Sequence, residues 1–410
     1  MAKHQNYWFE TEAPTIVNRS GIISNADVLI IGGGISGLLV LWQLLRSGVK
    51  NVYLVEESHV GYRASGRSSG QLMMRGSRSF SDIFHSYGLK AVNDYIDFIA
   101  ANNEIMRAWI DEHDLFCDLQ EGGGLRLAVD DDELIDLQEE AEIINSAMCG
   151  VNPTMLNRDE VKGILFSERF VGAMYVPTDA TFNPYMLVNK ITAKLDASGR
   201  RILSGCSVEE ITQRDEGWAV KIRNKGTITA KHVVHCTNAY ASQLLPEFKD
   251  FTVNVRAQMI ASDKLPESAQ KAMPKMSLSC NYGSEYFRLY KDRLLMGGMR
   301  HKVRGAQRDI IADGEVSRAV GQHLKNFMEE SFPYIKTPPT HTWSGIISQT
   351  NDGFPLVGPI PGRENQYINA GFNGYGFSHA LLASYAIRDL ITVGETELPA
   401  ISMFDPARAL

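Results

Sequence analysis

The chain has 410 residues, with a hydrophobic content of 44% and a charged content of 22%, which is ordinary for a globular protein. This length predicts about two to three domains. The net charge of −7 argues against a nucleic-acid-binding protein, which would carry a basic surface. No apolar run approaches the ~20 residues of a membrane helix, and the N-terminus has no apolar signal core. We therefore expect a cytoplasmic protein without a membrane span.

The cysteines are scattered, without a C-x-x-C pair or a histidine partner at metal-ligand spacing. A zinc site, an iron–sulfur cluster and a redox dithiol are therefore not expected, and no metal is predicted. Reduced, buried thiols are the expected state of these residues, which are Cys117, Cys149, Cys206, Cys236 and Cys280.

The first elements along the chain are a strand, a glycine turn, a helix and a second strand. The run Val28–Ile31 is wholly apolar, which is typical of a buried parallel strand. A helix is expected from Ser36 to about Ser47, and the second strand over Val52–Val55. This order of elements is the unit that holds the pyrophosphate and ribose of a dinucleotide.

Glycines fill the G-x-G-x-x-G pattern between the first strand and the helix. Gly32 permits the tight turn, Gly34 lets backbone N–H groups approach the phosphates, and Gly37 lets helix and strand pack closely. The helix that starts at Ser36 directs its positive end at the anion. Glu56 ends the second strand, can accept from ribose hydroxyls and favours FAD or NAD over NADP. An ordinary glycine turn is the alternative.

Helices follow a loop at 59–80 that is rich in Gly, Ser and Arg. Apolar residues recur with helical spacing from Leu89 to His113. An acidic helix is expected over 130–148, with acids in its first turn that favour the helix dipole. Asn157–Glu160 is a capping-box pattern, and Asn183 with Pro184 opens a helix that ends near Ala197.

The remaining sequence is mostly strands separated by turn signals. Short strands are expected at 201–203, 207–214, 218–223, 227–230 and 233–235, and longer ones at 251–262, 277–290 and 293–298. A helix over 314–332 follows, and the C-terminal part predicts a strand at 366–369, a glycine turn at 371–376 and a helix from near Phe377 to Thr392.

Glycine-rich segments that suit an anion recur at distant places, as a long, bent cofactor such as FAD requires. The segments in question are Gly32–Gly37 with Glu56, Ala64–Gln71, Ser207–Ile211, Thr237–Tyr240, Trp343–Gly345, Asp352–Gly358 and Gly371–Gly376. In order and spacing they resemble the FAD-dependent amino acid and amine oxidoreductases, the family of sarcosine oxidase, glycine oxidase and gamma-glutamylputrescine oxidase. The Asn6–Trp8 arm and the Ser65–Gln71 loop are most similar to the gamma-glutamylputrescine oxidase branch.

The resemblance implies an α/β fold in which a Rossmann-like FAD-binding domain of the glutathione-reductase type is interrupted by a substrate domain with a mixed sheet and helices. A second G-x-G-x-x-G, which a nicotinamide domain would need, is missing from the sequence, so electrons should come from an organic substrate. The expected segments are an N-terminal arm at 1–26, the FAD-binding domain at 27–80, 165–245 and 345–395, the substrate domain at 81–164 and 246–344, and a C-terminal tail at 396–410.

The resemblance also implies how FAD is held. Relatives with covalent flavin use a His in the loop after Glu56, where Arg67 stands here, or a Cys in a region that follows Cys280, where this chain has none. Non-covalent FAD is therefore expected, with Arg67 near the flavin or phosphates unless it is a surface arginine. The expected FAD-binding residues are Gly32, Gly34, Ser36, Gly37, Glu56, Ser65, Arg67, Ser68, Ser69, Gly70, Gln71, Val208, Thr237, Asn238, Gly371, Phe372, Asn373, Gly374 and Gly376.

Candidates for the substrate site lie on the strands after 277. Strand spacing places Tyr282, Tyr286 and Tyr290 on one face, which would suit an amine above a flavin, although plain sheet packing is the alternative. Glycine oxidases carry an arginine that pairs with the substrate carboxylate, and Ile347 stands at that position here. The candidates for substrate-pocket and catalytic roles are therefore Tyr286, Arg300 and His301, with Arg288 as another possible anchor.

The implied reaction is oxidation of the C–N bond of a primary or secondary amine. Hydride passes from the adjacent carbon to flavin N5, and water hydrolyses the imine that forms, which requires placement rather than an obligatory base. Sarcosine oxidases carry a lysine in the equivalent of Leu294–Gly297, and its absence leaves both O2 and another electron acceptor open. The alternatives are an amino acid oxidase or dehydrogenase with a relocated carboxylate anchor, and a flavoprotein whose FAD is structural.

Overall fold

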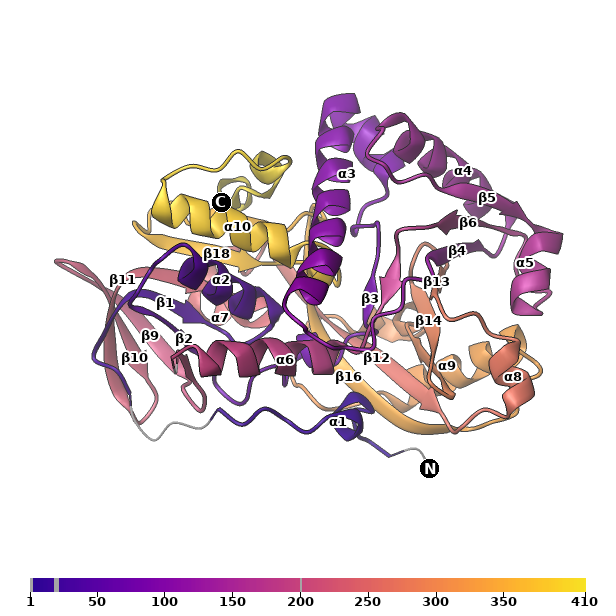
Figure 1. Ribbon diagram of the computed structural model, residues 1–410, viewed down its shortest axis with the longest axis horizontal. Helices are drawn as coiled ribbons and strands as arrows, with labels where there is room; N and C mark the ends of the chain where they lie inside the picture. The colour runs from indigo at the N-terminus through magenta and orange to yellow at the C-terminus, as the bar shows by residue number, and fades with distance from the viewer. Residues whose placement is uncertain (1–2, 18–21, 200) are drawn as a thin grey trace.

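The chain folds into two halves, each built on a large sheet (Figure 1). The computed structural model describes residues 3–17, 22–199 and 201–410. Parts of the predicted N-terminal arm, at 1–2 and 18–21, lie outside the described residues, as does residue 200. The mixed α/β architecture confirms the fold class expected from the sequence.

The first sheet, on the left in Figure 1, has eight strands and a parallel centre. Its strands are β1 (Asn25–Ile31), β2 (Val52–Val55), β8 (Ile202–Leu203), β9 (Val208–Arg214), β10 (Gly217–Ile222), β11 (Gly226–His235), β17 (Leu356–Pro359) and β18 (Gln366–Ala370). The hydrogen-bonded order is β17-β18-β11-β1-β2-β8, and the β9–β10 hairpin pairs with β11. β1 therefore lies at the centre, parallel to both β2 and β11.

β1 is apolar throughout its central part because both of its faces are buried. Val28 and Ile30 pack into a core with helices, whereas Leu29 and Ile31 pack into a second core with the β9–β10 hairpin. The helices on the first face are α2 (Ile35–Arg46), α6 (Pro184–Ala197) and α10 (Ala380–Thr392), and α2 contacts both of the others. The predicted dinucleotide unit is thus confirmed as strand, turn, helix and strand.

The second sheet, on the right in Figure 1, also has eight strands and is mostly antiparallel. Its strands are β4 (Gly124–Ala128), β5 (Thr154–Asn157), β6 (Gly172–Val176), β12 (Thr252–Ser262), β13 (Ser277–Cys280), β14 (Glu285–Tyr290), β15 (Arg293–Gly297) and β16 (Pro339–Thr350). The order is β16-β12-β15-β14-β13-β4-β6-β5. β6 lies in a segment that was assigned above to the FAD-binding domain, and the division into domain segments stays a prediction.

One face of the second sheet is covered by helices and the other faces the rest of the molecule. Phe287 and Leu289 on β14 pack with the helices α5 (Arg158–Leu165), α8 (Glu267–Lys271) and α9 (Arg318–Ser331). The alternate residues of β14, Tyr286 and Tyr290, pack on the opposite side with Met259 and Trp343. The period-two pattern therefore holds for these two tyrosines.

Tyr282 does not share their face, so that prediction was wrong. The expected strand at 277–290 is broken by a turn in which Asn281 and Tyr282 have φ values of 50° and 56°. Tyr282 is 56% exposed, and its hydroxyl donates to Asp136. A turn signal, Asn-Tyr-Gly, was present in the sequence but was outweighed by the apolar residues around it.

Helices complete the two halves. α3 (Phe80–Glu112) stands between the sheets in Figure 1. It begins before the predicted start at Leu89, because a first helical segment starts after the Ser79 cap and joins the predicted one through a kink at Gly88, whose φ is 83°. The Asn157 capping box and the Asn183 cap are confirmed. The other helices are α1 (Trp8–Thr11), α4 (Asp131–Ser146) and α7 (Ala241–Leu244), and two short strands, β3 (Gln71–Leu72) and β7 (Ala180–Thr181), pair with each other.

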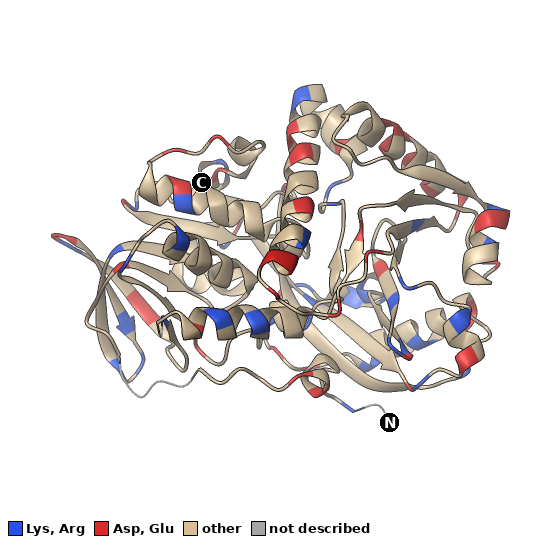
Figure 2. Ribbon diagram, in the orientation of Figure 1, with Lys and Arg blue, Asp and Glu red and all other residues tan. Residues whose placement is uncertain are grey.

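Acidic and basic residues are interspersed over both halves, and acidic residues gather on α4 (Figure 2). This distribution agrees with the small net negative charge of the chain. None of the helices in the described part of the chain has the length and apolar character needed to cross a bilayer.

Candidate active site

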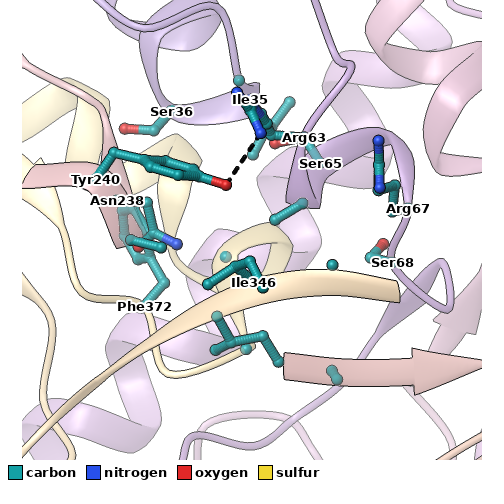
Figure 3. A pocket seen from close by; sticks show the side chains of 18 of the residues that line it. Ile35, Ser36, Arg63, Ser65, Arg67, Ser68, Asn238, Tyr240, Ile346 and Phe372 are labelled. Atoms are coloured by element: carbon teal, nitrogen blue, oxygen red, sulfur yellow. Dashed lines mark hydrogen bonds between the residues drawn. The ribbon is translucent and has the colours of Figure 1, made fainter. Parts of the chain in front are cut away.

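A cavity of about 790 Å³ is lined by residues from both sheets. We call its two sides the first-sheet wall, made by the ends of β1, β2 and β11 with their loops and by the glycine turn after β18, and the second-sheet wall, made by β12, β13, β14, β16 and the turn after β15. Figure 3 shows Ile35, Arg63, Ser65, Tyr240 and Phe372 around the cavity, with residues far apart in sequence lying side by side.

The first-sheet wall depends on glycines where the chain passes close to itself. Gly32 has a φ of 111°, and a Cβ there would lie 2.6 Å from the Cys236 carbonyl oxygen at the end of β11. A Cβ on Gly37 would lie 2.0 Å from the Gly32 carbonyl oxygen, so α2 and β1 can approach only without it. Gly34 precedes α2 and offers no side chain to cap it. The Ile35 N–H donates to Ser65 Oγ at 2.9 Å, and the start of α2 from Gly34 to Ser36 lines the cavity, where its positive end suits an anion.

Glu56 closes this wall at the end of β2. Its Oε2 accepts from the Gly33 N–H at 2.7 Å and its Oε1 from the Ser58 N–H at 2.8 Å. Burial raises the pKa of the Glu56 carboxyl, while these two N–H groups favour its charged form. The carboxylate is thus fixed at the cavity edge, where it can also accept from ribose hydroxyls.

The loop after β2 brings two arginines to the cavity. Arg67 is 7% exposed, which rules out the surface position considered above. Asp313 pairs with Arg63 at 2.9 Å and with Arg67 at 3.0 Å, and Arg63 also donates to the Tyr240 hydroxyl at 3.2 Å (Figure 3). Arg67 in addition donates to the Ser344 carbonyl at 3.0 Å. These bonds hold the loop against the second half of the molecule.

Two turns from the first sheet meet at the cavity and are tied together by asparagines. The Asn238 side chain accepts from the Gly371 N–H at 3.0 Å. The Asn373 side chain accepts from the Thr350 N–H at 2.8 Å and donates to the Gly371 carbonyl at 2.8 Å. The helix α10 begins only at Ala380, after a 3-10 turn, and not near Phe377 as expected. The glycine turn is therefore set by side chains rather than by the helix itself.

The residues present fit FAD. Thr237 and Ser279 both line the cavity, on opposite walls, and the hydroxyl of each is buried without a hydrogen-bond partner among the described residues. Buried polar groups normally have partners. Unpartnered hydroxyls, an open helix N-terminus and a fixed carboxylate are what a dinucleotide with phosphate, ribose and ring polar groups would satisfy.

Tyr286 is the main aromatic residue of the second-sheet wall. Its ring lies over Gly297 on β15, where a Cβ would come within 2.2 Å of the ring. Burial raises the pKa of the Tyr286 hydroxyl to about 12, so this group stays protonated near neutral pH. Ile347 also lines the cavity, which makes the wall apolar at the position where glycine oxidases were expected to carry arginine.

Arg300 and His301 reach the cavity from the 3-10 turn after β15. Arg300 makes only long hydrogen bonds, to the Ala306 carbonyl and Gln349 at 3.4 Å each, and no ion pair with any carboxylate in the ranges that the structure describes. Burial lowers the pKa of Arg300, and burial together with Lys302 and Arg300 lowers that of His301. His301 lies 3.4 Å from the buried Glu285 carboxylate.

Arg288, the other cation considered from the sequence, does not line the cavity. Its guanidinium donates to the carbonyls of Gly70 and Phe182, the latter at 2.9 Å. Burial lowers its pKa to about 9. It therefore supports the cofactor loop from behind and is not placed to hold a substrate.

Most of the residues predicted from the sequence come together at this cavity. The exceptions are Gly37, Gly70 and Gly371, which shape the backbone behind it. Whether the others contact FAD stays a prediction. Those that line the cavity are Gly32, Gly34, Ser36, Glu56, Ser65, Arg67, Ser68, Ser69, Gln71, Val208, Thr237, Asn238, Tyr286, Arg300, His301, Phe372, Asn373, Gly374 and Gly376.

Sequence reasoning missed several lining residues. Arg63 lies in the expected loop at 59–80, one residue before the Ala64–Gln71 motif, and its charge could have been noticed there. Met259 and Gln349 carry no local signal, because they reach the cavity through the pairing of β12 with β16. Asp313, which pairs with two lining arginines, lies in an irregular segment before α9 that no motif marks.

Other titratable groups have structural surroundings. His379, for which the sequence predicts a packed position within the last helix, lies instead just before α10 and is buried, with Nε2 2.9 Å from the Tyr95 hydroxyl and Nδ1 2.9 Å from the Tyr375 carbonyl oxygen. All of the cysteines are free, and all are buried except the half-buried Cys149. Within the described ranges, no cluster of His, Cys, Asp and Glu could hold a metal ion.

Comparisons with known proteins agree with this geometry. Residues 27–390 match the family described as FAD dependent oxidoreductase. Gamma-glutamylputrescine oxidoreductase of Escherichia coli (strain K12) is 30% identical over 372 residues, which are 89% of this chain and 83% of that protein.

Solved structures share the fold. L-proline dehydrogenase from P. horikoshii superposes with a TM-score of 0.79 at 21% identity, over 94% of this chain and 98% of that one. Glycine oxidase from Geobacillus kaustophilus has a TM-score of 0.79 at 21% identity, over 94% of this chain and 99% of that one. Because the family match spans most of the sequence, and a relative is 30% identical over 89% of it, this chain belongs to the family of FAD-dependent oxidoreductases.

Proposed function

We propose that this oxidoreductase oxidises the C–N bond of a primary or secondary amine, with FAD held non-covalently in the cavity. FAD supplies the two-electron acceptor, which takes a hydride from the carbon next to nitrogen, and water hydrolyses the imine product. The observation that carries the proposal is that one cavity is lined both by the glycine turn before α2 and by the side chains of the second-sheet wall. The names of the relatives, gamma-glutamylputrescine oxidoreductase and glycine oxidase, point to amines and amino acids.

Each part of the first-sheet wall has a role in holding the cofactor. The open start of α2 after Gly34 would take the phosphates, and Glu56 a ribose hydroxyl.

Cys206 and Cys236 line the cavity, but burial raises the pKa of both thiols, that of Cys236 to about 12. A protonated thiol is a poor nucleophile. Together with Arg67 in place of a histidine, this favours FAD without a covalent bond.

The second-sheet wall would bind and orient the substrate. Tyr286 offers an aromatic face and a protonated hydroxyl, and Met259 and Ile347 exclude water around it. An apolar residue at 347 cannot pair with an α-carboxylate, which favours an amine as the substrate.

The electron acceptor is O2 or another oxidant. Met296, which stands just before Gly297 where sarcosine oxidases were expected to place a lysine, is fully buried.

A second candidate is an amino acid oxidase or dehydrogenase with a relocated carboxylate anchor. Arg300 favours it, because this half-buried cation lines the cavity without an ion pair in the described part of the chain. A bidentate bond from its guanidinium would hold a substrate carboxylate. His301 adjoins it and would adjust the local charge with pH.

Anaerobic bleaching of the yellow protein separates these functions. A panel of amines and amino acids is added without oxygen, and flavin absorbance is followed. Bleaching by amines that lack an α-carboxylate supports the proposal, and bleaching by amino acids alone supports the second candidate. No bleaching, with dithionite still able to reduce the flavin, would contradict both and leave FAD as a structural group.

A further inference from the structure

The N-terminal arm, expected to be a plain extended segment, is buried against the loop after β2. Asn6 is 5% exposed and Trp8 is fully buried. The Trp8 indole lies edge-on to the Tyr290 ring, with a centroid separation of 4.8 Å. The arm thus packs beside the cavity, on the same face of β14 as Tyr286.

The arm and β16 together hold three consecutive carbonyl groups of this loop. Asn6 Nδ2 donates to the Gly66 carbonyl at 2.8 Å, and Trp8 Nε1 donates to the Ser68 carbonyl at 2.8 Å. Between them, Trp343 Nε1 donates to the Arg67 carbonyl at 2.9 Å. Every peptide plane from residue 66 to 68 therefore has its orientation fixed by a side chain from outside the loop.

Those same loop residues face the cavity on their other side. Arg67 and Ser68 both line it, and Ser65 Oγ accepts from the Ile35 N–H at 2.9 Å, which joins the loop to the start of α2. The donors are braced in turn, because Asn6 Oδ1 accepts from the Trp8 N–H at 3.2 Å. A loop held in this way enters binding in one conformation, and a preorganised site loses less entropy on binding.

We propose that Asn6 and Trp8 are positioning residues for FAD, acting through the backbone of Gly66, Arg67 and Ser68. The inference rests on the proposed assignment of the cavity to FAD. Removing either donor frees a carbonyl and lets the loop sample other conformations, so FAD affinity falls and the surroundings of the bound flavin change. Neither residue lines the cavity, so the effect is indirect.

The test compares Trp8→Phe and Asn6→Ala with Trp218→Phe. Trp218 is a matched control because it is 6% exposed and its Nε1 donates to the Glu364 carbonyl at 2.8 Å, yet it does not line the cavity. The readouts are the dissociation constant of added FAD, from flavin fluorescence quenching by apoprotein, and the visible spectrum and reduction potential of the holoprotein. We expect about tenfold weaker FAD binding in each arm variant, as for loss of one buried hydrogen bond.

In Trp218→Phe, FAD affinity and potential stay as in the wild type. The proposal is overturned if the arm variants bind FAD with wild-type affinity, spectrum and potential. If Trp8→Phe does not fold, Asn6→Ala decides by the same readouts. If neither arm variant folds while Trp218→Phe does, the arm is a core element and a positioning role is likewise refuted. Wild-type protein that takes up no FAD would refute the proposed function instead.

Discussion

The two walls of the cavity are built in different ways. The first-sheet wall depends mainly on backbone around the start of α2, with glycines where no Cβ fits and one carboxylate held by two N–H groups, and the loop after β2 adds Arg63 and Arg67. The second-sheet wall is made of side chains that arrive from β12, β14, β16 and a turn, with Tyr286 and Arg300 foremost. The first wall restricts shape and the second supplies chemistry.

This difference teaches where change is tolerated. A wall made of backbone tolerates no added atoms but binds any cofactor with the same phosphate and ribose, whereas a wall made of side chains can be altered one residue at a time. Substitutions in the first wall should therefore affect folding and FAD binding, and substitutions in the second should affect substrate preference. The predictions below test that division, beginning with the largest effect.

Gly37→Ala should lower the free energy of unfolding by about 3 kcal/mol, because overpacking of this kind forces backbone shifts. The new Cβ would lie 2.0 Å from the Gly32 carbonyl oxygen. Gly163→Ala is the matched control, since Gly163 is also helical and a Cβ there meets nothing within 4 Å. Urea unfolding and FAD content measure both. Equal stability of the two variants would contradict the claim that the close approach of Gly37 to the Gly32 carbonyl leaves no room for a Cβ.

Glu56→Gln should weaken FAD binding by a factor of about 30, since hydrogen bonds to a charged acceptor contribute about 1.5–3 kcal/mol. The amide would present N–H to one of the two backbone donors now at 2.7 and 2.8 Å. Glu267→Gln, at a side chain on α8 that is 80% exposed and does not line the cavity, is the control. Titration of apoprotein with FAD measures the change, and unchanged affinity would remove Glu56 from the cofactor site.

The buried His379, which follows the glycine turn of the first wall, should make the protein sensitive to acid. Burial lowers the pKa of His379 from 6.5 to about 4, so the unfolded chain binds more protons than the folded one between these pH values. Stability therefore falls as pH falls through this window, by about 2 kcal/mol from pH 6.5 to pH 5.

His379→Gln should remove this part of the pH dependence, as seen by urea unfolding at several pH values. His4→Gln, at an exposed residue of the N-terminal arm, is the control for the loss of a histidine at another position. Some slope remains in His379→Gln, because burial also lowers the pKa of His235 to about 4. An unaltered slope in His379→Gln would show that His379 does not contribute.

Arg300→Met tests whether the second-sheet wall determines substrate preference. It should raise KM about tenfold for substrates with a carboxylate and leave KM for uncharged amines and FAD affinity unchanged, as expected for a lost charge-assisted hydrogen bond. Arg300→Lys should restore part of the effect. Arg304→Met, at an exposed arginine of the next turn, is the control. Equal KM changes for all substrates would remove the anchor role.

The first wall was largely predictable because its signals are local. The apolar run of β1, the glycine spacing before α2 and the Asn183 cap each follow from residues within one turn or strand. Gly32, Gly37 and Glu56 could accordingly be identified from spacing alone. Their geometry leaves few other backbone conformations open.

The second wall depends on contacts that no local pattern encodes. β16 (Pro339–Thr350) was not predicted as a strand, although its Trp343–Gly345 motif was noticed, because its mixed polar pattern becomes regular only when paired with β12. The burial of Trp8 follows from its packing against Tyr290 and Trp343, on the face of the second sheet that Tyr286 shares. The prediction for Tyr282 was wrong because a turn at Asn281 and Tyr282 interrupts the strand, so the period-two spacing does not reach Tyr282. Such features follow from tertiary pairing rather than from propensity.

The central position of β1 sets a condition on how this protein is made. Ile31 pairs with His235 on β11, so one side of the strand has no neighbour until the ribosome has added roughly 200 further residues, which takes on the order of 10 to 40 s. During that interval the apolar run Val28–Ile31 is an unprotected edge, open to aggregation. A lower growth temperature, or a chaperone that shields nascent strands, should therefore raise the yield of folded protein.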